Sequence, residues 1–145
     1  MTVFADTSAV VKLYADERGS DLVAAAEPLV ISQLARVEVP AALWRKHRMG
    51  ELAADDLRVL LDAFKADYSG TADGPERFAR VVVNAEVLED AARLVGVHGL
   101  RAYDGVQLAS ARAARAAAPE CTAFAAFDKH LREAAAHEDF AVLER

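Results

Sequence analysis

The sequence has few of the features that mark secreted or membrane proteins. Cys121 is the single cysteine among 145 residues, so no internal disulfide can form and no oxidising compartment is needed. No apolar run approaches the roughly 20 residues that cross a bilayer. The apolar start of the chain is interrupted by Asp6 and lacks the basic residue and cleavage site of a signal peptide. We therefore expect a cytoplasmic protein.

Positive charge is also scarce. The chain has 17 Lys and Arg against 23 Asp and Glu, a formal net charge of −6 at pH 7. Nonspecific affinity for nucleic acid depends on cations that displace counterions from phosphates. An acidic protein is therefore a poor nonspecific binder of nucleic acid, and any action on nucleic acid must come from a local site.

Several catalytic motifs are absent. Neither the G-x-G-x-x-G nor the P-loop pattern occurs, so a nucleotide cofactor is not expected. The four histidines show no H-E-x-x-H spacing and no paired cysteines accompany them, which disfavours zinc and leaves them as expected surface residues. No G-x-S-x-G elbow surrounds Thr7 or Ser8, so a nucleophilic hydroxyl is disfavoured.

The composition supports a folded core. Hydrophobic residues make up 54% of the chain and charged residues 28%, which excludes a disordered acidic protein. The length suits one domain, over residues 1–145.

Apolar β-prone runs alternate with helical patterns along the chain. We expect strands at Thr2–Ala5, Pro28–Ile31, Phe78–Val83, Thr122–Phe127 and Phe140–Leu143. Helices are expected from the Asp6 turn to about Asp16, and at Asp21–Ala26, Ser32–Met49, Leu52–Tyr68, Ala85–Val95, Tyr103–Ala118 and Lys129–Ala136. This alternation predicts a three-layer α/β/α sandwich around a parallel sheet of about five strands.

Two aspartates follow predicted strands directly. Asp6 ends the first strand and Asp128 ends the run TAFAAF. In open α/β sheets, ligands bind beyond the carboxyl ends of the strands, where the strand order reverses. Each aspartate taken alone is explained as well by a turn or a helix cap.

Two further acids lie on predicted helices. Glu38 lies on the helix face expected to be apolar, formed by Leu34, Val37, Ala41 and Trp44. A carboxylate there needs a partner or a metal, and Arg45 is the nearest alternative partner along the helix. Asp104 opens a helix, where the helix dipole alone would favour it.

Four carboxylates that converge on one crevice repel one another. Protonation or a hard divalent cation relieves that repulsion. An all-oxygen ligand set suits Mg²⁺ or Mn²⁺.

Four segments resemble the PIN-domain ribonucleases, and their positions span nearly the whole chain. They are Phe4–Ala9 (FADTSA), Val37–Leu43 (VEVPAAL), Ala102–Ala109 (AYDGVQLA) and Ala126–Leu131 (AFDKHL). In length and in its start at the first strand, the chain looks most like the VapC-type toxins of bacterial toxin–antitoxin modules.

This resemblance implies a metal-dependent endoribonuclease with an α/β/α fold. It implies that Asp6, Glu38, Asp104 and Asp128 form the catalytic set around Mg²⁺, with Ser8 orienting a ligand or a water. It further implies an RNA substrate and a homodimer that a small antitoxin protein holds inactive.

Two other functions stay open at this point. In a phosphatase or phosphoacceptor domain, Asp6 would be phosphorylated and Lys129 would assist, although Ser8 stands where the phosphatase pattern has a second aspartate. In a non-catalytic binding module, the acids would be only helix caps and surface charge.

Overall fold

The central element of the fold is a parallel sheet. The structure is a computed structural model that describes residues 2–15, 23–24 and 28–143. Within these ranges five strands pair in the order β3-β2-β1-β4-β5, all parallel to their neighbours. Their bounds are β1 Thr2–Ala5, β2 Leu29–Ser32, β3 Ala79–Val81, β4 Cys121–Ala125 and β5 Ala141–Leu143. The predicted five-stranded parallel sheet is confirmed.

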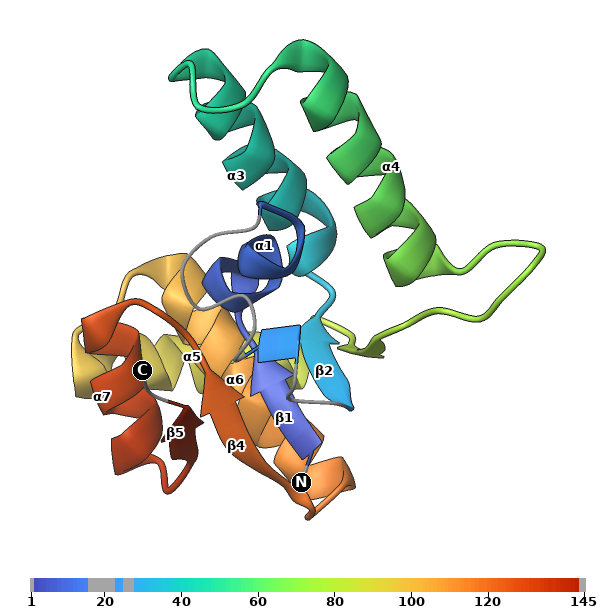
Figure 1. Cartoon of the computed structure of the whole chain (residues 1–145). Helices are drawn as coiled ribbons and strands as arrows, with labels where there is room; N and C mark the ends of the chain where they lie inside the picture. The colour runs from blue at the N-terminus through green and yellow to red at the C-terminus, as the bar shows by residue number, and fades with distance from the viewer. Residues whose placement is uncertain (1, 16–22, 25–27, 144–145) are drawn as a thin grey trace.

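Helices cover both faces of this sheet (Figure 1). On one face lie α1 (Thr7–Ala15), α3 (Ala35–Arg48) and α4 (Ala54–Ser69). On the other lie α5 (Ala85–His98), α6 (Ala102–Ala117) and α7 (Lys129–His137). The three-layer sandwich is confirmed, and α3 and α4 extend beyond the sheet as a helical arm.

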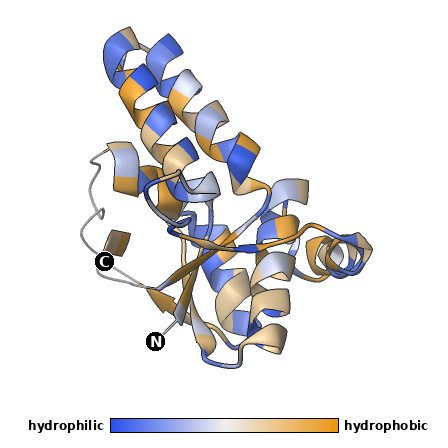
Figure 2. Ribbon diagram, turned by 90° about the vertical axis from the view of Figure 1, so that its right-hand side faces the viewer, coloured by the Kyte–Doolittle hydropathy of each residue, from blue (hydrophilic) through white to orange (hydrophobic). Residues whose placement is uncertain are grey.

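The alternation of side chains along the strands builds two cores. Val3 and Ala5 of β1 pack with the layer of α1, α3 and α4, whereas Phe4 faces α5, α6 and α7. Phe4 stacks on Phe124 of β4 with ring centroids 5.5 Å apart. Figure 2 shows hydrophobic colour along the central strands and hydrophilic residues over much of the helical arm.

Two strands end earlier than predicted, and beyond each end a backbone N–H donates to a side chain instead of to a neighbouring strand. β3 ends at Val81, and the N–H of Val83 donates to the side chain of Gln33 at 3.0 Å. β4 ends at Ala125, and the N–H of Phe127 donates to the Ser8 hydroxyl at 3.1 Å. Asp128 therefore begins α7 rather than ending a strand.

One predicted helix falls mostly outside the described residues. Of Asp21–Ala26, Val23 and Ala24 are described, both as helical. Within the described part of the chain, no helix has the length and apolar character needed to cross a membrane.

The sheet order fixes where a ligand site should form. The chain builds β2 and β3 on one side of β1, then β4 and β5 on the other. The order thus reverses at the β1–β4 pair, and a crevice is expected beyond the carboxyl ends of these two strands.

Candidate active site

A cavity of about 700 Å³ lies at this reversal point. All four acids predicted from the sequence line this cavity: Asp6, Glu38, Asp104 and Asp128. Ser8 lines it as well. The acids come from the end of β1, from α3, from the first turn of α6 and from the start of α7. The fold therefore brings together four carboxylates that are far apart in sequence.

Asp6 is the most buried of these acids, with 5% of its surface exposed. Its Oδ1 accepts hydrogen bonds from the Ser8 hydroxyl at 2.7 Å and from the Ala9 N–H at 3.0 Å. Burial raises the pKa of Asp6 to about 7; the Ser8 and Ala9 bonds oppose this, and the Asp104 and Glu38 charges add to it. A cation in the cavity would therefore favour the ionised form of Asp6.

Ser8 also joins the two central strands. Besides donating to Asp6, its hydroxyl accepts the backbone N–H of Phe127 just beyond β4. Its position thus orients the Asp6 carboxylate and holds the end of β1 against the chain that leads to Asp128.

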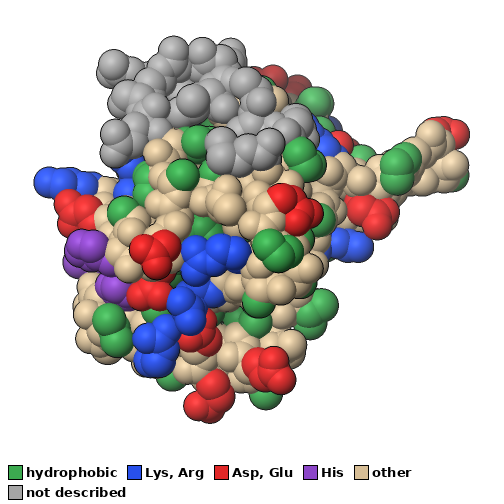
Figure 3. Space-filling view, turned by 90° about the horizontal axis from the view of Figure 1, so that it is seen from below, with side chains coloured by type: hydrophobic (Ala, Val, Ile, Leu, Met, Phe, Trp, Pro, Cys, Tyr) green, Lys and Arg blue, Asp and Glu red, His purple; other side chains and the backbone are tan. Residues whose placement is uncertain are grey.

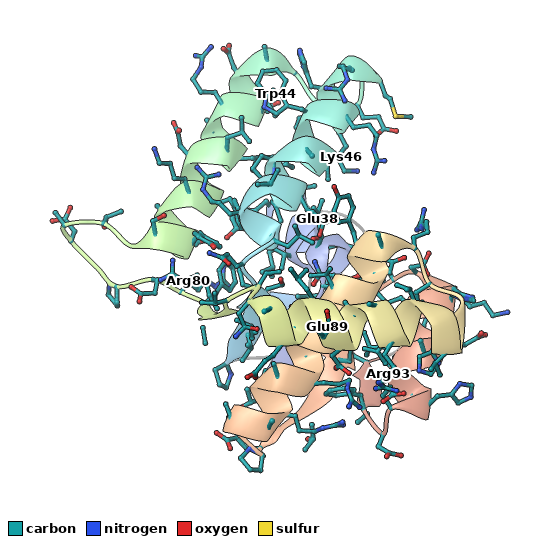
Figure 4. All side chains as sticks on the ribbon, turned by 180° about the vertical axis from the view of Figure 1, so that it is seen from behind. Glu38, Trp44, Lys46, Arg80, Glu89 and Arg93 are labelled. Atoms are coloured by element: carbon teal, nitrogen blue, oxygen red, sulfur yellow. The ribbon has the colours of Figure 1, made fainter. Side chains whose placement is uncertain are left out.

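Glu38 is held by two helices other than its own. Its Oε1 accepts from the Thr7 hydroxyl of α1 and from the Gln107 amide of α6, each at 2.8 Å. The Gln107 amide also donates to Thr7 at 3.0 Å. Figure 4 shows Glu38 where α3 meets the body of the molecule, with Lys46 further along the same helix.

The prediction of an apolar helix face around Glu38 is wrong. Val37 and Trp44, assigned to that face, are 68% and 46% exposed. The buried face of α3 is formed instead by Ala35, Val39 and Leu43. The partners of Glu38 are accordingly the polar groups of α1 and α6, and not Arg45.

Asp104 and Asp128 share one cation. The Arg101 Nε lies 3.4 Å from Asp104 Oδ2, and its Nη2 lies 3.8 Å from Asp128 Oδ2. Burial raises the pKa of Asp104, while Arg101 lowers it and Asp128 raises it further. The Arg101 side chain is 82% exposed, so water screens these contacts strongly.

Asp128 combines capping with a place in the site. Its Oδ1 accepts the Leu131 N–H at 2.9 Å and so caps α7. Its Oδ2 is the oxygen that faces Arg101. The cap thus uses one carboxylate oxygen and leaves the other to the cavity.

As placed, no three carboxylate, imidazole or thiol groups of the described residues lie close enough together to hold a metal ion. The four acids share the cavity, but they contact hydroxyl, amide and guanidinium donors rather than one common point.

Comparison with protein-family models matches the PIN domain over residues 3–137. The chain belongs to the PIN-domain family. It is 34% identical over 119 residues to ribonuclease VapC3 of Pyrobaculum aerophilum, and the match spans 77% of this chain and 82% of VapC3. The predicted family is thereby confirmed.

Solved structures support the same fold for this PIN domain. A toxin–antitoxin complex from Klebsiella pneumoniae matches with a TM-score of 0.58 and 18% identity, covering 98% of this chain and 96% of that one. FitAcB from Neisseria gonorrhoeae matches with a TM-score of 0.60 and 19% identity, over 98% and 96% of the two chains. At these identities the likeness concerns the fold.

Three polar side chains that line the cavity of the PIN domain were not among the predicted site residues: Glu51, Arg101 and Gln107. The role of Thr7 as a donor to Glu38 was not predicted either. The sequence does contain an indication that Gln107 belongs to the site. It is a polar residue within an apolar run, and it lies about one helical turn after Asp104. It is 2% exposed, and its Oε1 has no hydrogen-bond partner among the described residues.

The expectation of surface histidines is wrong for His98. Its side chain is 9% exposed, and its Nε2 lies 2.7 Å from Glu138 Oε2. No histidine of the described residues lines the 700 Å³ cavity of the PIN domain.

Proposed function

We propose that this PIN domain is a Mg²⁺-dependent endoribonuclease and the toxin component of a type II toxin–antitoxin system. The observation that carries the proposal is that Asp6, Glu38, Asp104 and Asp128 line one cavity at the strand-order reversal. The protein's membership of the PIN family and its similarity to ribonuclease VapC3 support the hydrolysis of RNA phosphodiester bonds.

The cavity residues suit a hard divalent cation by their chemistry. All four acids offer oxygen ligands, which favours Mg²⁺, with Mn²⁺ as the alternative. Asp6 and Asp104 would bind the ion directly, and Glu38 and Asp128 directly or through water. When bound, such an ion neutralises phosphodiester charge and makes a bound water more acidic.

Hydrogen bonds from neighbouring residues orient two of the four carboxylates for metal binding. Ser8 and the Ala9 N–H fix the Asp6 carboxylate, and Thr7 and Gln107 fix that of Glu38. The Arg101 side chain is exposed, and water weakens its ion pairs with Asp104 and Asp128. A divalent cation that binds these two carboxylates can therefore displace Arg101 at a small cost in free energy.

We further propose that the protein acts as one domain over residues 1–145 in the cytoplasm, as a homodimer held inactive by a cognate antitoxin protein. The structural neighbour from Klebsiella pneumoniae is a toxin–antitoxin complex, which supports an antitoxin partner. An antitoxin arginine would pair with the carboxylates in the cavity and exclude the metal from them.

The test is cleavage of a panel of structured RNAs with Mg²⁺ or with excess chelator, by the unaltered protein and by Asp6→Asn. We expect Mg²⁺-dependent cuts at discrete positions that Asp6→Asn abolishes. Asp62→Asn is the matched control, because Asp62 is exposed on α4 and outside the cavity.

Equal cleavage by Asp6→Asn would assign the activity to a contaminant. Absence of cleavage with Mg²⁺ and with Mn²⁺, together with no metal-induced rise in melting temperature, would overturn the nuclease proposal and favour a binding module. The melting temperature is informative because a ligand that binds only the native state must stabilise it.

The structure disfavours the phosphoacceptor alternative. Lys129, which would assist a phosphorylated Asp6, is 89% exposed, lies 3.9 Å from Glu133, and is not among the described residues that line the cavity. Acyl-phosphate trapping at Asp6 is therefore expected to give no adduct.

A further inference from the structure

A second cavity, of about 450 Å³, adjoins the candidate active site. The two cavities share four lining residues: Thr7, Glu38, Ala42 and Arg45. Because Glu38 lines both cavities, a ligand that reaches the carboxylates could continue into the second one, which we call the side groove.

One face of α3 forms most of the side groove. Ala41 and Ala42 leave space between Glu38 at one end and Arg45 and Arg48 at the other. Tyr103, in the first turn of α6, also lines the groove. It directly precedes Asp104 and is 64% exposed, so its ring is open to a ligand beside the carboxylate site.

The arginines of the side groove have no polar or ring partner among the described residues. Neither Arg45 nor Arg48 makes a hydrogen bond, an ion pair or a ring contact with any described residue. In contrast, Arg112 contacts both Asp90 and Glu138. The face seen in Figure 3 also shows basic side chains lying against acidic ones. The free guanidinium groups of the groove are thus available for an anionic ligand.

We propose that the side groove binds an unpaired nucleotide of single-stranded RNA next to the bond to be cut. The base stacks on Tyr103, and the neighbouring backbone phosphates contact Arg45 and Arg48. This inference rests on the proposed ribonuclease function and adds the residues that hold a nucleotide beside the bond to be cut.

The chemistry of the groove favours a single strand over a duplex. Proteins that hold single strands combine stacking on aromatic side chains with a cationic track for the backbone. A duplex keeps its bases stacked on each other, so none is free to lie against Tyr103. In a protein of net charge −6, two arginines without an acidic partner among the described residues, in one groove with an aromatic ring, also give a local site for phosphate.

The first test measures binding of fluorescein-labelled RNA octamers, A₈ and U₈, in excess chelator so that no RNA is cut. Tyr103→Leu should weaken binding about tenfold, because it removes one stacking partner. Tyr103→Phe keeps the ring and should bind as the unaltered protein does. Trp44→Leu is the control, since Trp44 is also exposed on the surface but lies outside both cavities.

The second test measures the salt dependence of the same binding. Arg45→Gln and Arg48→Gln should each lower the slope of log affinity against log salt by about 0.7, the value for one phosphate contact on a single strand. Arg58→Gln on α4, whose side chain is 73% exposed and which lies outside the groove, should leave the slope unchanged.

The outcomes separate this inference from the ribonuclease proposal. If Asp6→Asn abolishes cleavage but Tyr103→Leu binds both octamers normally, the groove is not a nucleotide site although the nuclease stands. If Tyr103→Leu weakens binding but no protein cuts RNA, the nucleotide site stands and the nuclease fails. Unchanged affinity for both octamers and unchanged salt slopes in all groove variants would overturn the inference.

Discussion

The Gln107 amide on α6 donates a hydrogen bond to Glu38 Oε1 on α3 at 2.8 Å, across 69 positions of the chain. The Thr7 hydroxyl donates to the same oxygen. Two donors on one oxygen fix the carboxylate and leave Oε2 without a donor among the described residues. Gln107 is therefore a positioning residue for Glu38.

Gln107→Leu should lower RNA cleavage about 10- to 100-fold and raise the Mg²⁺ concentration needed for half-maximal cleavage, as the loss of an outer-shell partner does at metal sites. Ser110→Ala is the control, because Ser110 is buried on the same helix and bonds Ser32 instead. Cleavage and Mg²⁺ titrations on both variants check this. An equal loss in both would indicate general destabilisation rather than positioning.

The burial of Asp6 makes stability depend on pH. Its pKa is about 7 in the folded protein, raised from 3.8, so the folded state binds one more proton than the unfolded chain between these values. The free energy of unfolding therefore falls as pH rises through this window, by roughly 2 to 3 kcal/mol between about pH 5 and pH 8. Urea unfolding in chelator should show this fall relative to Asp6→Asn, in which the group cannot titrate. Parallel pH profiles for the two proteins would contradict it.

Close packing of α5 and α6 next to Asp104 requires Gly105. A Cβ added there would overlap Val95 Cγ1, whereas one added at Gly96 would meet open space. Gly105→Ala should cost about 1 to 3 kcal/mol of unfolding free energy. Gly96→Ala should gain about 0.5 to 1 kcal/mol, because alanine favours the helix. Denaturant unfolding of both variants measures the contrast, and equal stabilities would show that the helices can separate freely.

A hydrogen bond between Tyr14 and Asp67 ties α1 to α4. The Tyr14 hydroxyl donates to Asp67 Oδ2 at 2.5 Å, and burial, reinforced by Asp67, raises the pKa of Tyr14 so that it stays protonated. Tyr14→Phe should cost about 1.5 kcal/mol of stability, since the acceptor is charged. Tyr68→Phe removes only a 3.4 Å bond to the Gln33 carbonyl and should cost less than about 0.5 kcal/mol. Thermal unfolding that ranks the two variants in the opposite order would refute this.

Much of the site could be predicted because its residues stand at the ends of regular elements. Asp6 directly follows an apolar strand, and Asp104 opens a helix, so both positions follow from local pattern. The parallel sheet then brings strand ends to one edge. The surroundings of Glu38 were not predictable in the same way, because several faces of α3 carry apolar residues and only packing against the sheet selects Ala35, Val39 and Leu43 as the buried one.

The parallel α/β/α fold could be inferred without coordinates, because hydrophobic period and connection length are local properties of the chain. The groups that hold the four acids could not, because they come from other elements. Gln107, Thr7 and Arg101 contact them across the gaps between elements, and the direction of a side chain across such a gap depends on how the helices pack. The same packing, and no local pattern, places Tyr103 in one groove with Arg45 and Arg48 of α3.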